Sequence, residues 1–366
     1  MAKETISFAR GAPSADILPA EAVREAAARA LESDWQRALS YGTGRGHPGL
    51  AEWIAELHGV SPDCVMVTNG SMEAAALLFR NLVADGDRVV VERPSYDRTL
   101  LLLAQQGADL VGAPLEEDGV DPAAVEAACS AGVPKLVHVI PHFHNPAGCT
   151  LAMPKRERLV ALAAEHGFTL FEDDPYRLIS FGGEPLKTML EMDEADRVIH
   201  ASSFSKTVSP GVRVGYLVGP EEQIATLAKR ANEQYISPSM IAESIVWELC
   251  RSGALEQNIE LVNAALRERR DVLVDSLREY LPEASFVVPE GGYFLWLDLE
   301  DDVDTPKLLG EAKEQGVSFV AGPDFMLEGG NSSLRLSFAP VPAEQIPEGI
   351  ERLARALERQ RAASPA

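Results

Sequence analysis

One lysine of the chain stands in a setting suited to covalent chemistry. Lys206 follows an apolar run at residues 198–201 and lies in the hydroxyl-rich segment SSFSKT at residues 202–207, with Arg213 shortly beyond. The other seven of the eight lysines lie at the terminus, beside a turn or on exposed helical patterns. Burial and neighbouring cations lower the pKa of a lysine and make it a nucleophile able to form a Schiff base. We therefore take Lys206 as the candidate nucleophile, with an ordinary solvated lysine as the alternative.

A second segment has the features of an anion site. Residues 68–73 read TNGSME and follow an apolar run, at the point where a helical pattern begins. Gly70 permits close approach of the backbone, and the free amides at the start of a helix bind anions. A plain helix cap by Ser71 is the alternative.

Two more polar segments follow apolar runs. Residues 171–176 read FEDDPY, in which two adjacent aspartates serve either as a turn and helix cap or as partners of a cationic ligand group. Residues 141–148 read PHFHNPAG, and Asn-Pro-x-Gly is a turn signal. His142 and His144 lack a third ligand nearby, so we predict no metal site. An anion cup, a carboxylate, an amide and a lysine are together what pyridoxal phosphate requires.

The elements that position these groups follow from hydrophobic periodicity. Strand-like runs at residues 64–68, 88–92, 136–140, 168–172, 198–201 and 212–218 alternate with helical patterns at 72–83, 121–131 and 154–166. This alternation predicts an α/β fold with a mostly parallel sheet, whose ligands lie at the carboxyl ends of the strands. Beyond residue 220 we expect long helices at 221–233 and 238–281. A smaller α+β lobe follows, with strands at 285–288, 294–299, 317–320 and 334–338 and helices at 305–315 and 343–359.

Composition and charge limit the class of protein. A chain of 366 residues is long enough for two domains. Its 33 basic and 56 acidic residues give a net charge of −23, which argues against nucleic-acid binding. Its four cysteines are scattered and suit a reducing compartment. The N-terminus has no apolar leader, and the chain has no run of 18 apolar residues, so we expect a cytoplasmic protein that does not bind membranes.

With these motifs in hand, the chain resembles the fold-type I, class I/II aminotransferases, nearest the aminoadipate and aromatic-type branch. The motifs TNGS, RPSY, NPAG, EDDPY, SFSK, PGVRVG, PEGGYFLW and LRLSF occur in the order of that family. The resemblance implies a pyridoxal-phosphate enzyme that exchanges an amino group between an amino acid and a 2-oxo acid. It also implies a homodimer. We expect a large domain at 41–250 with a seven-stranded, mostly parallel sheet, and a small domain at 251–366 that the segment 1–40 joins.

The resemblance assigns roles to residues at the matching positions. Lys206 matches the lysine that forms the Schiff base and moves the proton, and Asp173 matches the carboxylate paired with the pyridine nitrogen. Asn145 and Tyr176 match the donors to the ring's 3-oxygen, and Tyr96 matches the aromatic residue stacked on the ring. The remaining implied cofactor contacts are Gly70, Ser71, Met72, Ser203, Ser205, Arg213 and, from the neighbouring subunit, Tyr41.

Substrate binding is implied at fewer positions. Arg335 matches the arginine that holds the substrate carboxylate, and Asn145 is also implied in substrate binding. Arg10 stands where relatives usually have glycine, and Tyr293 where they have a smaller or more flexible residue. Met72 and His144 stand where relatives commonly have glutamine. From Arg10 and Tyr293 we expect acidic or polar amino acids as substrates, with glutamate and 2-oxoglutarate as the general pair.

Two other functions use the same fold. A pyridoxal-phosphate lyase, decarboxylase or synthase would share the cofactor residues and differ in the bond that is broken. A sensor module of a transcription regulator would carry a basic, winged-helix DNA-binding domain ahead of the family segment. The resemblance begins at Ile6 and the chain is acidic, so we expect no such domain.

Overall fold

An eight-stranded sheet forms the centre of the larger part of the molecule. The computed structural model describes residues 5–183 and 186–363. The strand order is β2-β9-β8-β7-β6-β3-β4-β5, in which β8, β7, β6, β3 and β4 are parallel. β9 runs antiparallel to both of its neighbours. The strands are β2 (Val65–Thr68), β3 (Arg88–Arg93), β4 (Asp109–Glu116), β5 (Gly119–Val120), β6 (Leu136–Val139), β7 (Thr169–Asp173), β8 (Val198–Ser203) and β9 (Gly215–Val218). The two-residue β5 is the strand beyond the expected seven.

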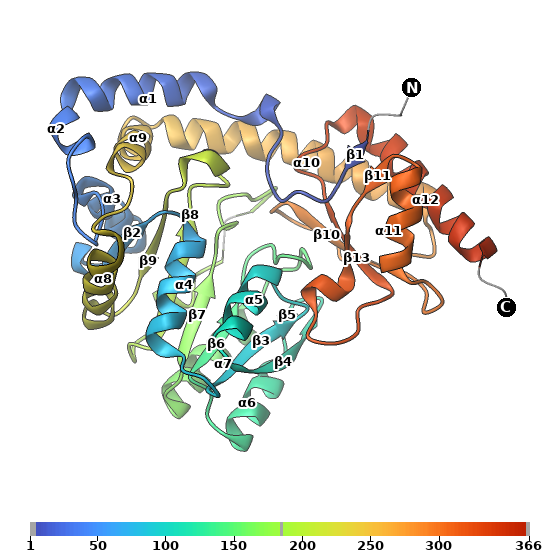
Figure 1. Ribbon diagram of the computed structural model, residues 1–366, viewed down its shortest axis with the longest axis horizontal. Helices are drawn as coiled ribbons and strands as arrows, with labels where there is room; N and C mark the ends of the chain where they lie inside the picture. The colour runs from blue at the N-terminus through green and yellow to red at the C-terminus, as the bar shows by residue number, and fades with distance from the viewer. Residues whose placement is uncertain (1–4, 184–185, 364–366) are drawn as a thin grey trace.

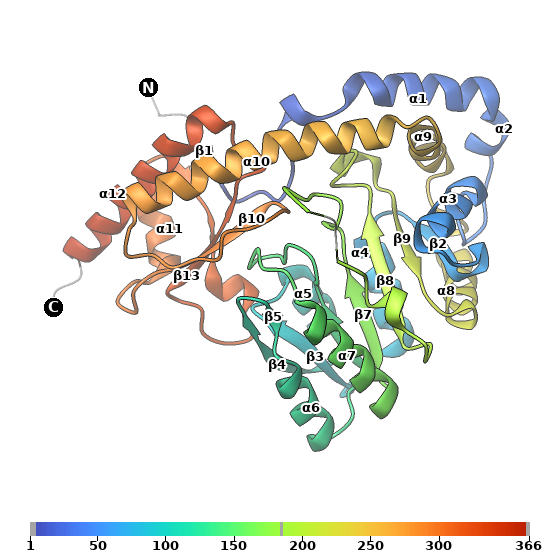
Figure 2. The same cartoon turned by 180° about the vertical axis from the view of Figure 1, so that it is seen from behind.

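Helices cover both faces of this sheet (Figures 1 and 2). Apolar side chains of α4 (Ser71–Leu82), α5 (Asp97–Gln105) and α8 (Glu221–Tyr235) pack on one face. Side chains of α6 (Pro122–Ala131) and α7 (Met153–His166) pack on the other. Because both faces are covered, β2, β6 and β9 are buried at every position, as is usual for strands in such sheets. The carboxyl ends of β6, β7 and β8 therefore lie side by side at one edge.

The smaller part of the molecule has its own sheet. β10 (Phe294–Asp298) and β12 (Val320–Ala321) both pair antiparallel with β13 (Ser333–Ser337). Helices α11 (Thr305–Glu314) and α12 (Ile346–Ala363) and the 27-residue α10 (Ala254–Tyr280) pack against it (Figure 1). β1 (Ile6–Ser7) pairs with β11 (Val317–Ser318), and Phe8 is buried in the same core. The start of the described chain thus packs with the smaller part, while the domain boundaries at 40 and 250 stay a prediction.

The remaining helices are α1 (Ala20–Ser33), α2 (Trp35–Ala38), α3 (Pro48–His58) and α9 (Met240–Arg251). Helices α1, α3 and α9 form a third core at the β2 edge of the large sheet. Short 3-10 helices occur at Ala15–Ile17, Pro62–Cys64, Leu190–Met192, Pro210–Val212, Gly322–Phe325 and Ala343–Gln345. No helix in the described ranges is long and apolar enough to cross a membrane.

Two expectations about elements were wrong. The single helix expected at 238–281 is two helices, α9 and α10, because Gly253 between them adopts a left-handed conformation with φ +76°. The strand expected at 285–288 is only one bridge, between Ser285 and Asp298. The sequence patterns also missed β4, whose residues are mostly half-buried or exposed and lack a continuous apolar run.

Candidate active site

The polar segments that the sequence singled out meet at one cavity. They reach it from the starts of α4 and α5 and from the loops after β6, β7 and β8. The lining residues are Ser71, Met72, Tyr96, Ile140, Asn145, Asp173, Pro175, Tyr176, Ser203, Ser205, Lys206, Pro210 and Arg213. Neighbouring parallel strands end at the same edge of the sheet, which is why segments so far apart in sequence converge.

Lys206 points at this cavity from the loop after β8. Its Nζ donates a hydrogen bond to the carbonyl of Gly11 at 2.9 Å and lies 5.3 and 5.0 Å from the ring centroids of Tyr176 and Tyr293. Burial, together with the cations Arg335 and Arg213, lowers the pKa of Lys206 to about 8, although the charge of Asp173 opposes this shift. A much larger share of the amine is therefore neutral near pH 7–8 than for an exposed lysine.

Asp173 is the last residue of β7 and has one carboxylate oxygen without a partner. Its Oδ2 lies 3.5 Å from Nε2 of His138 on β6. Its Oδ1 is buried and has no hydrogen bond from any described residue. A buried acceptor left unsatisfied costs about 1–3 kcal/mol, so Oδ1 is suited to receive a proton donor from a ligand. The protonated ring nitrogen of pyridoxal phosphate is such a donor.

Another part of the cavity lining forms an anion cradle. Gly70 has φ +90°, and a Cβ atom there would collide with the guanidinium of Arg213. Arg213 Nη1 lies 3.4 Å from Ser205 Oγ, and Ser203 Oγ donates to Ser205 Oγ at 2.9 Å. The start of α4, two hydroxyls and a fixed cation together fit a phosphate group. Cradle and carboxylate both fit pyridoxal phosphate.

Arg335 on β13 is held ready for a carboxylate. Its Nη1 donates to Asn145 Oδ1 at 2.9 Å and its Nη2 donates to the carbonyl of Ala9 at 2.8 Å. Its guanidinium lies 4.3 Å from the ring centroid of Phe294 and 4.7 Å from that of Phe325. Burial lowers the pKa of Arg335, but an arginine still stays charged. The two rings and two hydrogen bonds leave its planar charge in a fixed orientation.

The two tyrosines of the cavity remain proton donors at neutral pH. Burial, together with Asp97 and Asp173, raises the pKa of Tyr96 to about 12. Burial also raises the pKa of Tyr176, whose ring packs edge-on against Tyr293 with centroids 5.5 Å apart. A neutral phenol can donate to an anionic oxygen of a ligand.

Five expected site residues do not line the cavity, namely Gly70, Arg335, Tyr41, Arg10 and Tyr293. Gly70 directly precedes the lining residue Ser71, and Arg335 bonds to the lining residue Asn145. Tyr41 is 84 % exposed. Arg10 is exposed next to Gly11, the residue whose carbonyl accepts from Lys206. Tyr293 is fully buried, and its hydroxyl donates to the main-chain carbonyl of Lys206 at 3.0 Å. This hydrogen bond connects Tyr293 to the loop after β8 that carries Lys206.

Sequence reasoning missed some contacts of the site. The carbonyls of Ala9 and Gly11 bind Arg335 and Lys206, and no side-chain motif could have revealed them. Pro175 lies within the recognised FEDDPY segment, so its place in the lining could have been inferred. His138 lies beside Asp173 because their strands pair in register, with His138 opposite Phe171.

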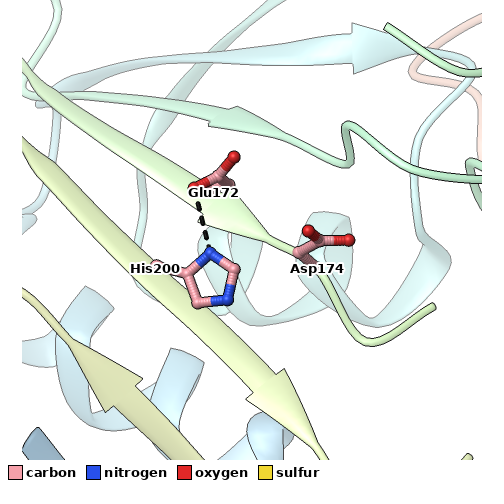
Figure 3. Close-up of side chains that lie close together, drawn as sticks. All are labelled: Glu172, Asp174 and His200. Carbon is pink, nitrogen blue, oxygen red and sulfur yellow. Dashed lines mark hydrogen bonds and ion pairs between the residues drawn. The ribbon is translucent and has the colours of Figure 1, made fainter. Parts of the chain in front are cut away.

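A buried polar layer supports the end of β7 (Figure 3). Glu172 bonds to His200 Nδ1 at 2.9 Å and accepts from the amide of Met189 at 2.8 Å. Asp174 bonds to His142 Nδ1 at 2.8 Å; burial opposes its charge, but His142 and nearby cations hold its pKa below the usual value. Glu172, Asp174 and His200 bring ligand atoms within 4.8 Å of one another, a spacing that a metal could use. Glu172 and His200 instead bond to each other, so we interpret the layer as support for Asp173.

Comparison with known proteins agrees with this geometry. The family described as aminotransferase class I and II matches residues 3–353. The 2-aminoadipate transaminase of Thermus thermophilus is 35% identical over 96% of this chain and 90% of its own length. The aromatic-amino-acid aminotransferase 1 of Thermococcus litoralis is 32% identical over 98% of this chain and 89% of its own. A crystal structure of the alpha-aminoadipate aminotransferase from Thermus thermophilus, complexed with N-(5'-phosphopyridoxyl)-L-leucine, superimposes with a TM-score of 0.94 at 34% identity, covering 99% of this chain and 94% of that one.

Proposed function

The chain belongs to the aminotransferase class I and II family, and we propose the roles of its residues and its substrate class. Its reaction is the pyridoxal-phosphate-dependent exchange of an amino group between an amino acid and a 2-oxo acid. The observation that carries the assignment of residues is the shared cavity. There Lys206, the unpartnered Oδ1 of Asp173 and the cradle around Arg213 face the same space.

The chain's own residues divide the work. The bound cofactor supplies an aldehyde that accepts the amino group and a ring that takes up electrons when the substrate Cα loses its proton. Lys206 Nζ, with its lowered pKa, would act as the base that accepts this proton and holds it for return. Asp173 Oδ1 would hold a proton on the ring nitrogen of the cofactor, and Tyr176 and Asn145 would donate hydrogen bonds to its ring oxygen. Arg335 binds the substrate carboxylate in the orientation that Asn145 fixes.

We propose acidic or polar amino acids as substrates. The relatives carry names from two side-chain classes, 2-aminoadipate and aromatic amino acids. Arg10 favours the acidic class of substrate. It is an exposed cation, and its chain neighbour Gly11 accepts a hydrogen bond from Lys206. Glutamate and 2-oxoglutarate are then the general pair.

A donor comparison tests both the reaction and the substrate class. Stoichiometric conversion of the cofactor by glutamate alone, followed by recovery with 2-oxoglutarate, is the expected result. Steady release of ammonia or carbon dioxide would indicate a lyase or decarboxylase instead. Arg10→Ala should reduce kcat/KM for glutamate relative to leucine and phenylalanine, whereas Arg24→Ala, at an exposed arginine of α1, should not. An unchanged preference in Arg10→Ala would remove Arg10 from the substrate site.

We also propose a homodimer and a cytoplasmic location. Support for the dimer comes from large apolar side chains that are exposed on α1, α2, α9 and the adjoining loops, namely Leu31, Trp35, Leu39, Tyr41, Ile236 and Ile241. Such patches usually mark protein interfaces, and identical subunits most often pair with twofold symmetry. Support for the location comes from the four cysteines, all free.

A further inference from the structure

We propose that His144 is a positioning residue for the carboxylate-binding pair Asn145 and Arg335. In this role its ring carries the proton on Nε2 and is held by Glu92. The inference rests on the proposed function of Arg335 and Asn145, and concerns a residue outside the lining of the cavity. His144 is 1 % and Glu92 2 % exposed, so both groups act within the protein interior.

The contacts of the ring determine where its proton lies. The main-chain N–H of Ala147 donates to His144 Nδ1 at 3.2 Å, and an amide nitrogen can only donate here. Nδ1 must therefore present a lone pair, which places the proton on Nε2. Nε2 lies 2.9 Å from Glu92 Oε2 and donates to it. A hydrogen bond to a carboxylate is roughly twice as strong as a neutral one, so Glu92 selects this tautomer.

These bonds fix the turn that carries Asn145. Within the turn, His144 N donates to the carbonyl of Cys149 at 2.8 Å, and Gly148 N donates to the carbonyl of His144 at 2.6 Å. The ring closes the same turn from the side through Ala147. Asn145 follows His144 directly, and its Oδ1 accepts from Arg335 at 2.9 Å. Loss of the ring contacts would free the turn and with it the orientation of the arginine.

Glu92 connects the turn to a second part of the site. It lies near the end of β3, and its Oε2 also accepts from the amide of Ile140 at 2.8 Å. Tyr96, the residue before α5, follows on the loop after β3. The pair Glu92–His144 therefore ties the segment that carries Tyr96 to the segment that carries Asn145.

His142 shows that not every histidine of this segment has this role. Its Nδ1 bonds to Asp174 Oδ2 at 2.8 Å, on the supporting layer behind β7. Its Nε2 is buried without a partner among the described residues. Of the two, His144 alone bonds to the backbone of the turn through its ring.

The test compares two replacements of His144. Glutamine can donate to Glu92 and accept from Ala147, whereas leucine can do neither. Hydrogen exchange of the Ala147 amide is measured in the holoenzyme and in the cofactor-free protein, together with kcat and KM for the amino donor. His144→Leu should speed exchange at Ala147 and raise KM, each by ~10-fold or more, with a smaller change in kcat. His144→Gln should stay within about threefold of the wild type in both. His166→Leu, on the half-buried last residue of α7, is the matched control and should change neither.

Either of two results would overturn the proposal. One is unchanged exchange at Ala147 in His144→Leu, and the other is a His144→Gln variant as impaired as His144→Leu. Should the leucine variant fail to fold, imidazole ¹⁵N spectra of the wild-type protein decide, because a proton on Nδ1 of His144 contradicts the proposal. The exchange and spectral measurements do not depend on turnover. If the protein has no transaminase activity, the proposed function is refuted. Hydrogen exchange at Ala147 and the imidazole spectra still test the role of His144.

Discussion

At the scale of single residues, the site holds several cations and one carboxylate in fixed positions around Lys206. Lys206 has neighbouring cations in Arg335 and Arg213 and an opposing charge in Asp173, and burial strengthens each of these interactions. The same burial leaves Asp173 Oδ1 without a partner among the described residues, so that a ligand can supply the proton. Cofactor binding and amine reactivity therefore depend on one arrangement of four side chains.

The lowered pKa of Lys206 gives a prediction for cofactor binding. The neutral amine is the reactive form, and the pKa of this amine is about 8 against an ordinary value of 10.5. Covalent incorporation of pyridoxal phosphate into the cofactor-free protein should speed up roughly tenfold per pH unit below pH 8 and level off above it. Stopped-flow absorbance measures the rate. Lys206→Ala should show no borohydride-fixable cofactor and no turnover; transamination at the wild-type rate in this variant would remove Lys206 from the mechanism.

Asp173 carries a prediction of a different kind. Asp173→Ala should still bind cofactor through the cradle around Arg213, but it should lose the charge that keeps the ring nitrogen protonated. A lost electrostatic contact of this kind costs several kcal/mol, so we expect kcat to fall by ~10²-fold or more. Single-turnover kinetics with glutamate measure the loss. If the rate is unchanged, Asp173 is a turn residue and Asp174 becomes the candidate.

The residues of the site were predictable where a motif and its place after a strand coincided. Lys206, Asp173, Asn145 and Ser71 belong to such motifs, and the structure brings them to one cavity. Contacts that depend on register were not predictable. His138 faces Asp173 only because β6 and β7 pair with His138 opposite Phe171.

At the scale of elements, buried strands were the features most readily predicted. β2, β6 and β9 are continuous apolar runs, and such runs are visible in a sequence. β4 at the side of the sheet has few buried positions and no such run. Helices α9 and α10 were expected as one helix, and the left-handed conformation of Gly253 lies between them. The hydrophobic pattern of the sequence therefore did not predict strands exposed at the sheet edge or the local backbone conformation that ends a helix.

Helix α9 contains a carboxylate that should make stability depend on pH. Burial raises the pKa of Glu243 to about 8 from 4.5, and the like charge of Glu73 adds to this, although the amide of His47 donates to it at 2.6 Å. The folded protein therefore holds a proton that the unfolded chain releases above about pH 4.5. Its stabilising effect is complete below that pH and is lost as the pH rises towards 8.

Glu243→Gln tests this dependence. Replacing the carboxyl with a neutral amide should flatten the fall in unfolding free energy, which for one such group is roughly 1.4 kcal/mol per pH unit at most. The variant should be more stable than the wild type at pH 9 and similar to it at pH 5. Urea unfolding at the two pH values measures the difference, with Glu52→Gln on the exposed side of α3 as control. Parallel pH curves for Glu243→Gln and the wild type would contradict the prediction.

At the scale of the whole molecule, the surface around α2 exposes several large apolar side chains. Trp35 is 53 %, Leu39 64 % and Tyr41 84 % exposed, and all three lie in or shortly after α2, the helix labelled in Figure 1. A net charge of −23 disfavours association of identical chains, so contact requires an apolar area large enough to outweigh the repulsion. In the proposed homodimer, the exposed apolar side chains of α1, α2 and α9 would contribute to this area. Tyr41 lies within it and away from the cavity of its own chain.

The last prediction follows from this placement of Tyr41. If its hydroxyl donates to the cofactor phosphate of the neighbouring subunit, two inactive chains should complement each other. One chain carries Lys206→Ala, and the other carries Tyr41→Ala with Gly42→Ala, at a glycine where a Cβ atom would collide with Met240. In the mixed dimer both lesions then fall in one site, and the second site has an intact lysine and an intact tyrosine. Activity should recover to as much as half of the wild-type value per mixed dimer, measured after subunit exchange is verified with tagged chains. Mixed dimers that form and stay inactive would mean that each site is built from a single chain.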